Sequence, residues 1–214
     1  RVRVVRSPDE IGEPDALILP GSKNVIGDLE ALRRCGMAET VRRLAEGGRT
    51  EIVGVCGGFQ MLGETLADPH GIESEAGGAD GLALLPATTV LAAEKTLTRV
   101  QAEHLPSGLP VTGYEIHHGL TEAADAEPVL RAADGRVIGV AATDGLTWGT
   151  YLHGVFDADR FRRWFVDGLR RRRGLAADGE VRATYDLEPA LDALADAVRD
   201  ALDLDAVYRV MGLR

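Results

Sequence analysis

The sequence contains little cysteine, few aromatic residues and no long apolar run. Its two cysteines, Cys35 and Cys56, are too few for a disulfide framework, and they lie in no metal-ligand spacing. No window approaches the about 20 apolar residues of a membrane-spanning helix, and the start has no signal-peptide pattern. We therefore expect a cytoplasmic protein with no membrane partner and no metal site.

Basic residues are outnumbered by acidic ones. Lysine and arginine together number 24, against 34 aspartates and glutamates, which gives a net charge of −10. Nucleic-acid binding needs a basic surface, so nucleic acid is not an expected partner. The length of 214 residues and the hydrophobic content of 45% suit one α/β domain with a substantial core. Because the chain opens at Arg1 without methionine, we interpret it as a piece of a longer protein.

The first part of the chain alternates between strand and helix patterns. Short apolar runs predict strands, and apolar residues at helical spacing predict helices between them. Strands are expected over residues 2–5, 16–19 and 52–55, and helices over residues 28–34, 37–44 and 59–66. This alternation predicts a parallel sheet covered by helices on both faces. Residues 67–80 are rich in Gly, Asp, Glu and Pro, which predicts a surface loop.

The second part of the chain changes to a β pattern and ends in helices. Strands are predicted over residues 88–91, 96–100, 111–117, 137–142 and 148–152. We expect them to extend the parallel sheet with antiparallel strands. Helices are predicted over residues 159–173 and 187–207. The arginines at positions 170–173 fit a solvated helix end, where the dipole favours cations, or an anionic partner.

Cys56 stands between a predicted strand and a predicted helix, in the pattern Gly54-x-Cys56-x-Gly58. This is the form of a nucleophile elbow, in which glycines permit a tight turn that exposes the nucleophile. The helix dipole and nearby N–H groups at such a position favour the thiolate. The pattern predicts that Cys56 is a catalytic nucleophile; the alternative is a small buried packing residue. Cys35 has no partner motif and is interpreted as structural.

A thiol nucleophile needs a base, and the sequence offers five histidines. His70 and His104 lie in polar segments and are expected to be exposed. His153 follows the predicted strand 148–152, so it lies at a strand end where it can meet Cys56. We therefore predict a Cys56–His153 pair; the alternative is that His153 is a loop residue without a role.

A glycine-containing turn follows another predicted strand, over the residues Pro20-Gly21-Ser22-Lys23-Asn24. Open α/β sheets bind ligands beyond the carboxyl ends of their strands, and this turn is such a place. A flexible connection explains Pro20-Gly21 equally well when it is considered alone.

Four segments of the sequence together resemble one enzyme family. They are Leu19-Pro20-Gly21-Ser22-Lys23-Asn24-Val25-Ile26-Gly27-Asp28-Leu29, Cys56-Gly57-Gly58-Phe59-Gln60-Met61-Leu62-Gly63, Gly113-Tyr114-Glu115-Ile116-His117 and Tyr151-Leu152-His153-Gly154-Val155-Phe156. The second and fourth are similar to class I (triad-type) glutamine amidotransferases, and all four in this order resemble the cobyric acid synthase branch. The resemblance runs from Asp15 to the helix after His153. It implies a flavodoxin-like, mostly parallel sheet flanked by helices, with an antiparallel β extension.

The resemblance implies a glutaminase reaction. Cys56 would attack the side-chain amide carbon of glutamine, and His153 would act as general base and acid. The oxyanion would be held by the N–H of Gly57 and by an N–H of the Gly21–Ser22 turn. Gln60 matches a position of the glutamine pocket in the wider class.

The sequence departs from the wider class at one position. Many of these amidotransferases carry a glutamate two residues after the histidine, where this chain has Val155. Glu115, Asp157 or a backbone carbonyl is left to orient His153, and the sequence does not choose among them. Glu115 and His117 can equally serve to shape the pocket.

The resemblance also implies partners outside this chain. Cobyric acid synthases resemble two-part enzymes in which an amino-terminal, ATP-dependent synthetase domain amidates corrinoid carboxylates. This chain has no Gly-x-x-x-x-Gly-Lys-Ser/Thr motif, and residues 1–214 look like the carboxyl-terminal glutamine amidotransferase domain alone. We therefore expect glutamine as substrate, the synthetase domain of the same protein as partner, and no cofactor here. ATP, Mg²⁺ and the corrinoid substrate would bind the synthetase domain.

Two alternatives to this reading stay open. One keeps the glutaminase and changes the acceptor to a cell-wall lipid intermediate or another corrinoid acid, as in cobyrinic acid a,c-diamide synthase. The other is a catalytically silent domain that only docks its synthetase. The favoured hypothesis is ammonia supply for amidation of adenosylcobyrinic acid a,c-diamide to cobyric acid.

Overall fold

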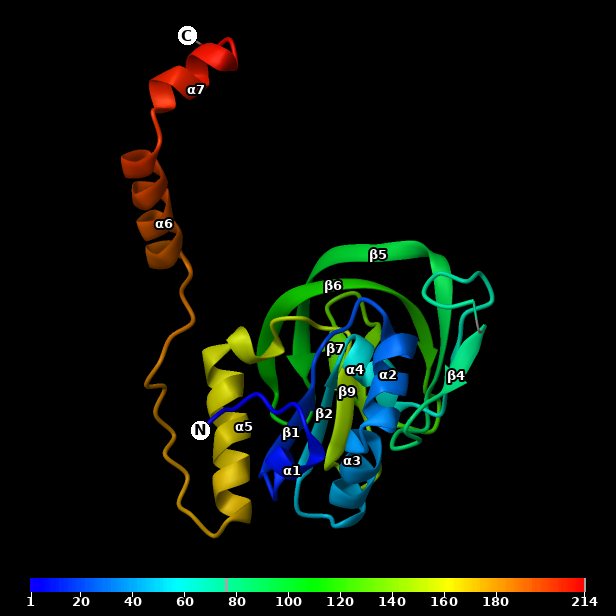
Figure 1. Ribbon diagram of the computed structural model, residues 1–214. Helices are drawn as coiled ribbons and strands as arrows, with labels where there is room; N and C mark the ends of the chain where they lie inside the picture. Colours follow the sequence, from blue (N-terminus) through cyan, green and yellow to red (C-terminus); the bar gives the residue numbers. More distant parts are fainter. Residues whose placement is uncertain (76, 214) are drawn as a thin grey trace. The chain divides into compact units, whose positions relative to one another are not determined.

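The computed structural model describes residues 1–75 and 77–213 and divides into two compact units (Figure 1). The first unit is Arg1–Glu180, and the second begins at Val181. The candidate catalytic residues all belong to the first unit. The two units are therefore described separately.

One mixed sheet forms the centre of the first unit. Its strands are β1 (Ala16–Leu19), β2 (Glu51–Val55), β3 (Thr65–Ala67), β4 (Gly78–Asp80), β5 (Thr88–His104), β6 (Leu109–Glu122), β7 (Glu127–Ala132), β8 (Val137–Ala141) and β9 (Thr147–Thr150). Within the described residues their order is β1-β2-β9-β8-β7-β5-β3-β4, and β6 pairs with β5. The strands β1, β2 and β9 are parallel, whereas β8, β7, β5 and β6 continue the sheet with antiparallel pairs. The predicted α/β class and its antiparallel extension are confirmed.

Helices cover both faces of the parallel strands, as predicted. They are α1 (Pro8–Ile11), α2 (Val25–Arg34), α3 (Met37–Glu46), α4 (Gly57–Leu62) and α5 (Asp159–Arg172), with a short 3-10 helix, η1 (Val155–Asp157). In Figure 1, α2 and α3 lie on one side of β1, β2 and β9, and α5 lies on the other. One hydrophobic cluster includes Leu29 of α2 and Val41 of α3, and a second includes Phe161 and Phe165 of α5 against Trp148 of β9.

The strand predicted over residues 2–5 is wrong. These residues form no strand, and the side chains of Val2 and Val4 are 96% and 86% exposed. An extended segment needs a hydrogen-bonded neighbour to become a strand, and β1 pairs with β2 instead. The short helix α1 was not predicted.

The predicted helix after Cys56 is shorter than expected. It ends at Leu62, because Gly63 has an extended backbone, and Leu66 lies in the strand β3. The segment 67–80, predicted as a loop, contains the short strand β4, which pairs with β3. Apolar spacing at Leu66 fits a helix and a buried strand equally, so the pattern could not separate them.

The antiparallel part is built on one long hairpin of β5 and β6. The strands predicted over residues 88–91 and 96–100 are parts of the single strand β5, whose pairing with β6 shifts between Leu91 and Thr96. The strand β7 was not predicted. The helix predicted over 159–173 is confirmed as α5.

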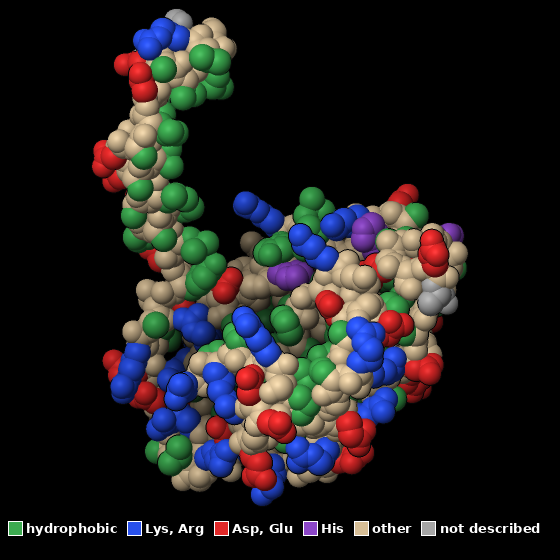
Figure 2. Space-filling view, viewed as in Figure 1, with side chains coloured by type: hydrophobic (Ala, Val, Ile, Leu, Met, Phe, Trp, Pro, Cys, Tyr) green, Lys and Arg blue, Asp and Glu red, His purple; other side chains and the backbone are tan. Residues whose placement is uncertain are grey.

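The second unit contains two helices in place of the single helix predicted over residues 187–207. These are α6 (Glu188–Ala201) and α7 (Leu204–Val210). Leu202 is extended, and the Asp203 carboxylate accepts the N–H of Ala206, so a new helix begins there. Neither helix buries a residue, and Figure 2 shows apolar side chains on the surface of this unit. Throughout the described residues, no helix has the length and apolarity needed to cross a membrane.

Candidate active site

Cys56 lies in the turn between β2 and α4, where the sequence predicts it. Its backbone angles are φ 51° and ψ −110°, which a side-chain-bearing residue rarely adopts. Such a conformation costs about 1–3 kcal/mol and persists only where the surroundings impose it. Gly54 contributes to this constraint, because a methyl group placed on it would lie 2.6 Å from the backbone N of Phe59. The strand and the helix therefore pass each other too closely for any residue but glycine at this position.

The sheet brings Cys56 and His153 to the same edge. Their strands β2 and β9 are parallel neighbours in which Val55 pairs with Thr150, so their carboxyl ends coincide. The N–H of Cys56 donates to the carbonyl of Thr150 at 2.8 Å. His153 follows three residues later, after the strand has ended.

Gly21 lies between the two predicted catalytic residues. A methyl group placed on Gly21 would lie 3.0 Å from Cε1 of His153 and 3.8 Å from Cβ of Cys56. The adjacent backbone contacts the elbow too, because a methyl group on Gly57 would lie 2.8 Å from the N of Ser22. The structure thus brings Cys56, His153, Gly57 and the 21–22 turn together.

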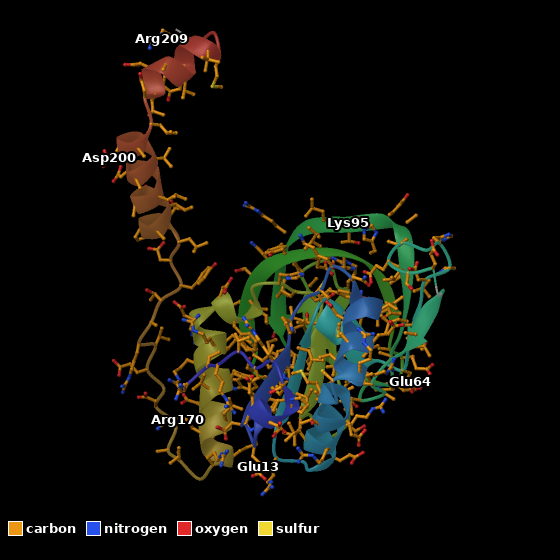
Figure 3. The ribbon with its side chains drawn as sticks, in the orientation of Figure 1. Glu13, Glu64, Lys95, Arg170, Asp200 and Arg209 are labelled. Carbon is orange, nitrogen blue, oxygen red and sulfur yellow. The ribbon has the colours of Figure 1, made fainter. Side chains whose placement is uncertain are left out.

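The Cys56 thiol is buried, and its Sγ lies 3.6 Å from the carbonyl oxygen of Ile116 on β6. Burial raises the pKa of this thiol, and the charge of Glu73 raises it further. The Gly57 N–H and the charge of Lys95 lower the pKa, but the net effect is a rise. Lys95 lies on β5 (Figure 3). The sequence favoured the thiolate, so the expected direction is wrong. The six-residue helix α4 and one N–H do not offset the loss of water around the sulfur.

His153 is held by the hairpin strand β6. Its backbone exchanges two hydrogen bonds with Tyr114, at 3.2 and 2.9 Å, and the two rings stack with centroids 5.0 Å apart. Burial lowers the pKa of His153, and the nearby His117 lowers it further. Among the described residues, Nε2 of His153 is buried without a hydrogen-bond partner. A neutral ring with a free nitrogen is able to accept a proton.

The carboxylates that the sequence left as candidates do not bond to the His153 side chain within the described residues. Glu115 is buried and bonds to His117 Nε2 at 3.4 Å and to Arg136 at 2.9 Å. Burial alone raises the pKa of Glu115, but its bonds to His117 and Arg136 outweigh this and lower it. Asp157 lies in η1, where its N–H donates to the carbonyl of residue 154. The position of His153 therefore rests on other contacts.

The side chains of Ser22 and Gln60 both form hydrogen bonds with other side chains of the protein. The hydroxyl of Ser22 donates to Asp28 at 2.5 Å and accepts the N–H of Asn24 at 3.0 Å. The backbone N and the Cβ of Ser22 both face Gly57. Gln60 is buried in α4, and its Nε2 donates to the hydroxyl of Tyr151 at 3.2 Å. A glutamine-pocket role for Gln60 stays a prediction.

His104 is buried, which contradicts the expectation that it is exposed. It packs against Phe161 and Trp164 of α5, and its Nδ1 lies 2.8 Å from the hydroxyl of Ser107. Burial lowers the pKa of His104 to about 4. The sequence did not reveal that His104 lies near the end of a long strand, because the loop residues that follow it made the whole segment look polar. His70 is exposed, as predicted.

Cys35 is exposed at the end of α2, so it is not a packing residue. Its thiol lies 3.5 Å from the carbonyl oxygen of Leu32. It is remote in the fold from the turn that carries Cys56, since it follows the other end of α2. Cys35 therefore offers a matched control thiol.

Sequence reasoning missed two residues of this region. Tyr114 belongs to one of the four segments that carry the family resemblance, but the sequence indicated no role for it. Its place beside Glu115 in a predicted strand, where neighbouring side chains point to opposite faces, was the signal available for it. Glu73 lay in a predicted loop, yet its carboxylate accepts the N–H of Val25 at the start of α2, at 2.6 Å. No local pattern connects residues 73 and 25, because the contact depends on the fold.

Comparisons with known proteins show the family to which the sequence is similar. The family model of the CobB/CobQ-like glutamine amidotransferase domain matches residues 1–161. A cobyric acid synthase of Nitratidesulfovibrio vulgaris is 49% identical over 99% of this chain and 46% of its own length. A cobyric acid synthase of Synechococcus elongatus is 46% identical over 99% of this chain and 44% of its own length. The chain therefore spans less than half the length of these relatives.

A solved structure shows the same architecture. A glutamine amidotransferase crystal structure superposes with a TM-score of 0.57 at 19% identity, covering 77% of this chain and 84% of that one. At this identity the likeness concerns the fold alone. It confirms the predicted amidotransferase-like α/β fold.

Proposed function

The chain belongs to the CobB/CobQ-like glutamine amidotransferase family, and from this premise we propose that it hydrolyses glutamine with Cys56 as nucleophile and His153 as base. The observation that carries the proposal is the convergence of Cys56 and His153 on Gly21. A thiol, a neutral imidazole and a backbone turn at one sheet edge are the parts that amide hydrolysis through a thioester requires.

The buried thiol determines the first step of the reaction. Because burial raises the pKa of Cys56, the sulfur is protonated at neutral pH and must lose its proton to act. His153 accepts this proton as the sulfur attacks the amide carbon of glutamine. The protonated imidazole then donates to the departing nitrogen, and ammonia leaves. Water, activated by the same ring, hydrolyses the glutamyl thioester and regenerates the thiol.

Two backbone N–H groups are proposed to stabilise the oxyanion that forms in each half of the reaction. One is the N–H of Gly57, which already lowers the pKa of Cys56 by a hydrogen bond. The other comes from the Gly21–Ser22 turn, whose backbone packs directly against Gly57. Removal of one such donor in a comparable site costs about 10²–10³-fold in rate. Gln60 is proposed to shape the glutamine pocket beside them.

The ammonia is proposed to serve a synthetase domain of the same protein. This proposal rests on the relatives named cobyric acid synthase, of which the chain spans less than half. In this scheme an ATP- and Mg²⁺-dependent domain activates side-chain carboxylates of a corrinoid, and ammonia converts them to amides. The acceptor would be adenosylcobyrinic acid a,c-diamide, and the product cobyric acid, within the cytoplasm.

The test uses the two cysteines as a matched pair. A glutamine analogue that alkylates thiols should label Cys56 in the wild type, with the site read by peptide mass spectrometry. Cys56→Ala should abolish both labelling and glutamine hydrolysis, whereas Cys35→Ala should retain both because Cys35 is exposed and remote. Labelling confined to Cys35, or hydrolysis that survives Cys56→Ala, would contradict the proposal.

A further inference from the structure

The candidate base His153 lacks the carboxylate that usually fixes a catalytic histidine. A base must keep its ring in one orientation to receive a proton efficiently, and a hydrogen-bonded third group commonly provides this. Here Val155 is a buried apolar residue, and Glu115 is already bonded to His117 and Arg136. Another part of the structure must therefore hold the imidazole plane.

Tyr114 makes the contact that can hold this plane. Its ring stacks on the His153 ring with an interplanar angle of 8° and a centroid separation of 5.0 Å. The backbones of the two residues are also bonded in both directions, from Tyr114 N to His153 O and from His153 N to Tyr114 O. The opposing contact comes from Gly21, which faces the Cε1 edge of the imidazole. The ring is thus restrained on a face and on an edge.

Core packing does not account for the placement of Tyr114. The residue is 46% exposed and belongs to neither hydrophobic cluster of the described residues. No hydrogen bond of its hydroxyl is found within the described part of the chain. One part of Tyr114 lines an open groove of about 900 Å³, together with residues such as Leu97 and Arg99. Within the described residues, the aromatic contact of the Tyr114 ring is the one with the His153 imidazole.

We propose that Tyr114 is a positioning residue, whose aromatic face sets the plane of the His153 imidazole in place of a carboxylate. The inference rests on the proposed glutaminase function, which supplies the reason for orienting His153. Stacking restrains rotation of the imidazole without adding a charge beside it. It also leaves Nε2 of His153 without a partner, so this nitrogen stays available for proton transfer.

The experiment compares Tyr114→Phe, which keeps the aromatic face, with Tyr114→Leu, which keeps an apolar side chain without it. Leu97→Ala is the control, since Leu97 lines the same groove and is 72% exposed. The first measurement is the proton NMR shift of His153 Cε1–H, assigned by its loss in His153→Asn. An adjacent aromatic face displaces this resonance. Tyr114→Phe and Leu97→Ala should therefore keep the wild-type chemical shift, whereas in Tyr114→Leu the resonance should move away from it.

The second measurement is steady-state hydrolysis of glutamine by the full-length natural protein. Misplaced catalytic groups lose about 10- to 100-fold in rate, so Tyr114→Leu should lower kcat by this factor and change KM little. Tyr114→Phe and Leu97→Ala should remain close to wild type. Thermal unfolding checks that every variant is folded. If Tyr114→Leu does not fold, Tyr114→Phe still tests the proposal, because it should keep wild-type activity.

The two proposals fail in different ways. Wild-type protein without glutaminase activity would overturn the proposed function. Active wild type with an equally active Tyr114→Leu, or an unchanged His153 shift in that variant, would overturn the positioning role alone. Loss of activity in Tyr114→Phe as large as in Tyr114→Leu would also overturn it, because the phenyl ring preserves the stack.

Discussion

Cys56 combines a strained backbone with a buried thiol, and these features have opposite effects on a nucleophile. The positive φ of Cys56 confirms the tight turn that the sequence predicted between the strand and the helix. Burial withholds the water that would stabilise a thiolate, so the pKa of the thiol rises. The surroundings of Cys56 therefore do not favour its thiolate. In the proposed reaction, activation would come from His153, whose pKa is lowered so that its ring is neutral.

The charge of Glu73 gives a prediction at the residue scale. Its carboxylate raises the pKa of Cys56, so Glu73→Gln should lower that pKa and shift the pH dependence of thiol alkylation to lower pH. The amide oxygen of glutamine can still accept the N–H of Val25, which preserves the start of α2. The measurement is the rate of iodoacetamide labelling at Cys56 as a function of pH, by mass spectrometry. Glu64→Gln, at an exposed position (Figure 3), is the control. An unshifted pH profile in Glu73→Gln would show that the charge of Glu73 does not raise the pKa of Cys56.

The sequence was sufficient to predict that the candidate site residues lie together, but not the environment of the thiol. Cys56, His153 and Gly21 each follow a strand, and parallel strands place such positions at one edge, so their proximity was predictable. The thiol environment was not. It depends on Ile116 from the hairpin and Glu73 from a distant loop, and neither is near Cys56 in sequence.

The segment after β3 shows how one side chain can organise an element. The Asp68 carboxylate accepts the backbone N–H groups of Ile72, Glu73 and Ser74, at 2.8, 2.8 and 2.9 Å. These bonds fix the turn that carries Glu73 to the start of α2. The loop composition predicted a surface loop but not its internal structure. An isolated aspartate in a polar segment has no pattern that separates it from solvated neighbours.

Removal of the Asp68 carboxylate should loosen this turn. Asp68→Ala removes three hydrogen bonds to N–H groups of half-buried residues, and each such bond contributes about 0.5–1.5 kcal/mol where water can replace it. The expected result is a lower Tm and faster proteolytic cleavage within residues 68–75, while Asp125→Ala, at an exposed position, changes neither. Unchanged cleavage in Asp68→Ala would show that the turn is held by other contacts.

The effect of Asp68 should also depend on pH. Burial raises the pKa of Asp68, but the hydrogen bonds from Glu73, Ile72 and Ser74 outweigh it and lower the pKa. The stabilisation is therefore complete above the unfolded-state pKa of about 3.9 and is lost as the pH falls through the folded-state value. The Tm difference between wild type and Asp68→Ala should be full at pH 7 and shrink in acid.

Element boundaries were predicted less well than element types. The alternation around β1, α2, α3 and β2 was correct, because each element has a strong apolar period. Leu66 was assigned to a helix and lies in β3, since one apolar residue fits either period. The single helix predicted at the end of the chain is broken at Asp203, where the carboxylate caps α7 and competes with continuation of α6.

At the scale of the whole molecule, the fold and the candidate chemistry belong to one unit. Both hydrophobic clusters and the residues of the candidate site lie within Arg1–Glu180, and the family match covers residues 1–161. The helices α6 and α7 bury none of their residues. Short helices are marginal in water unless an apolar face is packed, so α6 and α7 have little stability of their own.

Truncation after Glu180 tests this division. The cut keeps Asp178 and Gly179, whose N–H groups donate to the buried carboxylate of Asp167 on α5 at 2.9 and 3.0 Å. The shortened chain should therefore unfold at the same Tm, and its Cys56 should be alkylated at the wild-type rate. A change of 1 kcal/mol shifts Tm by about 2–4 °C in a domain of this size. A larger fall in Tm on truncation would show that the second unit stabilises the first. As a control, a cut before Asp178 should lower Tm, because it removes the hydrogen-bond partners of Asp167.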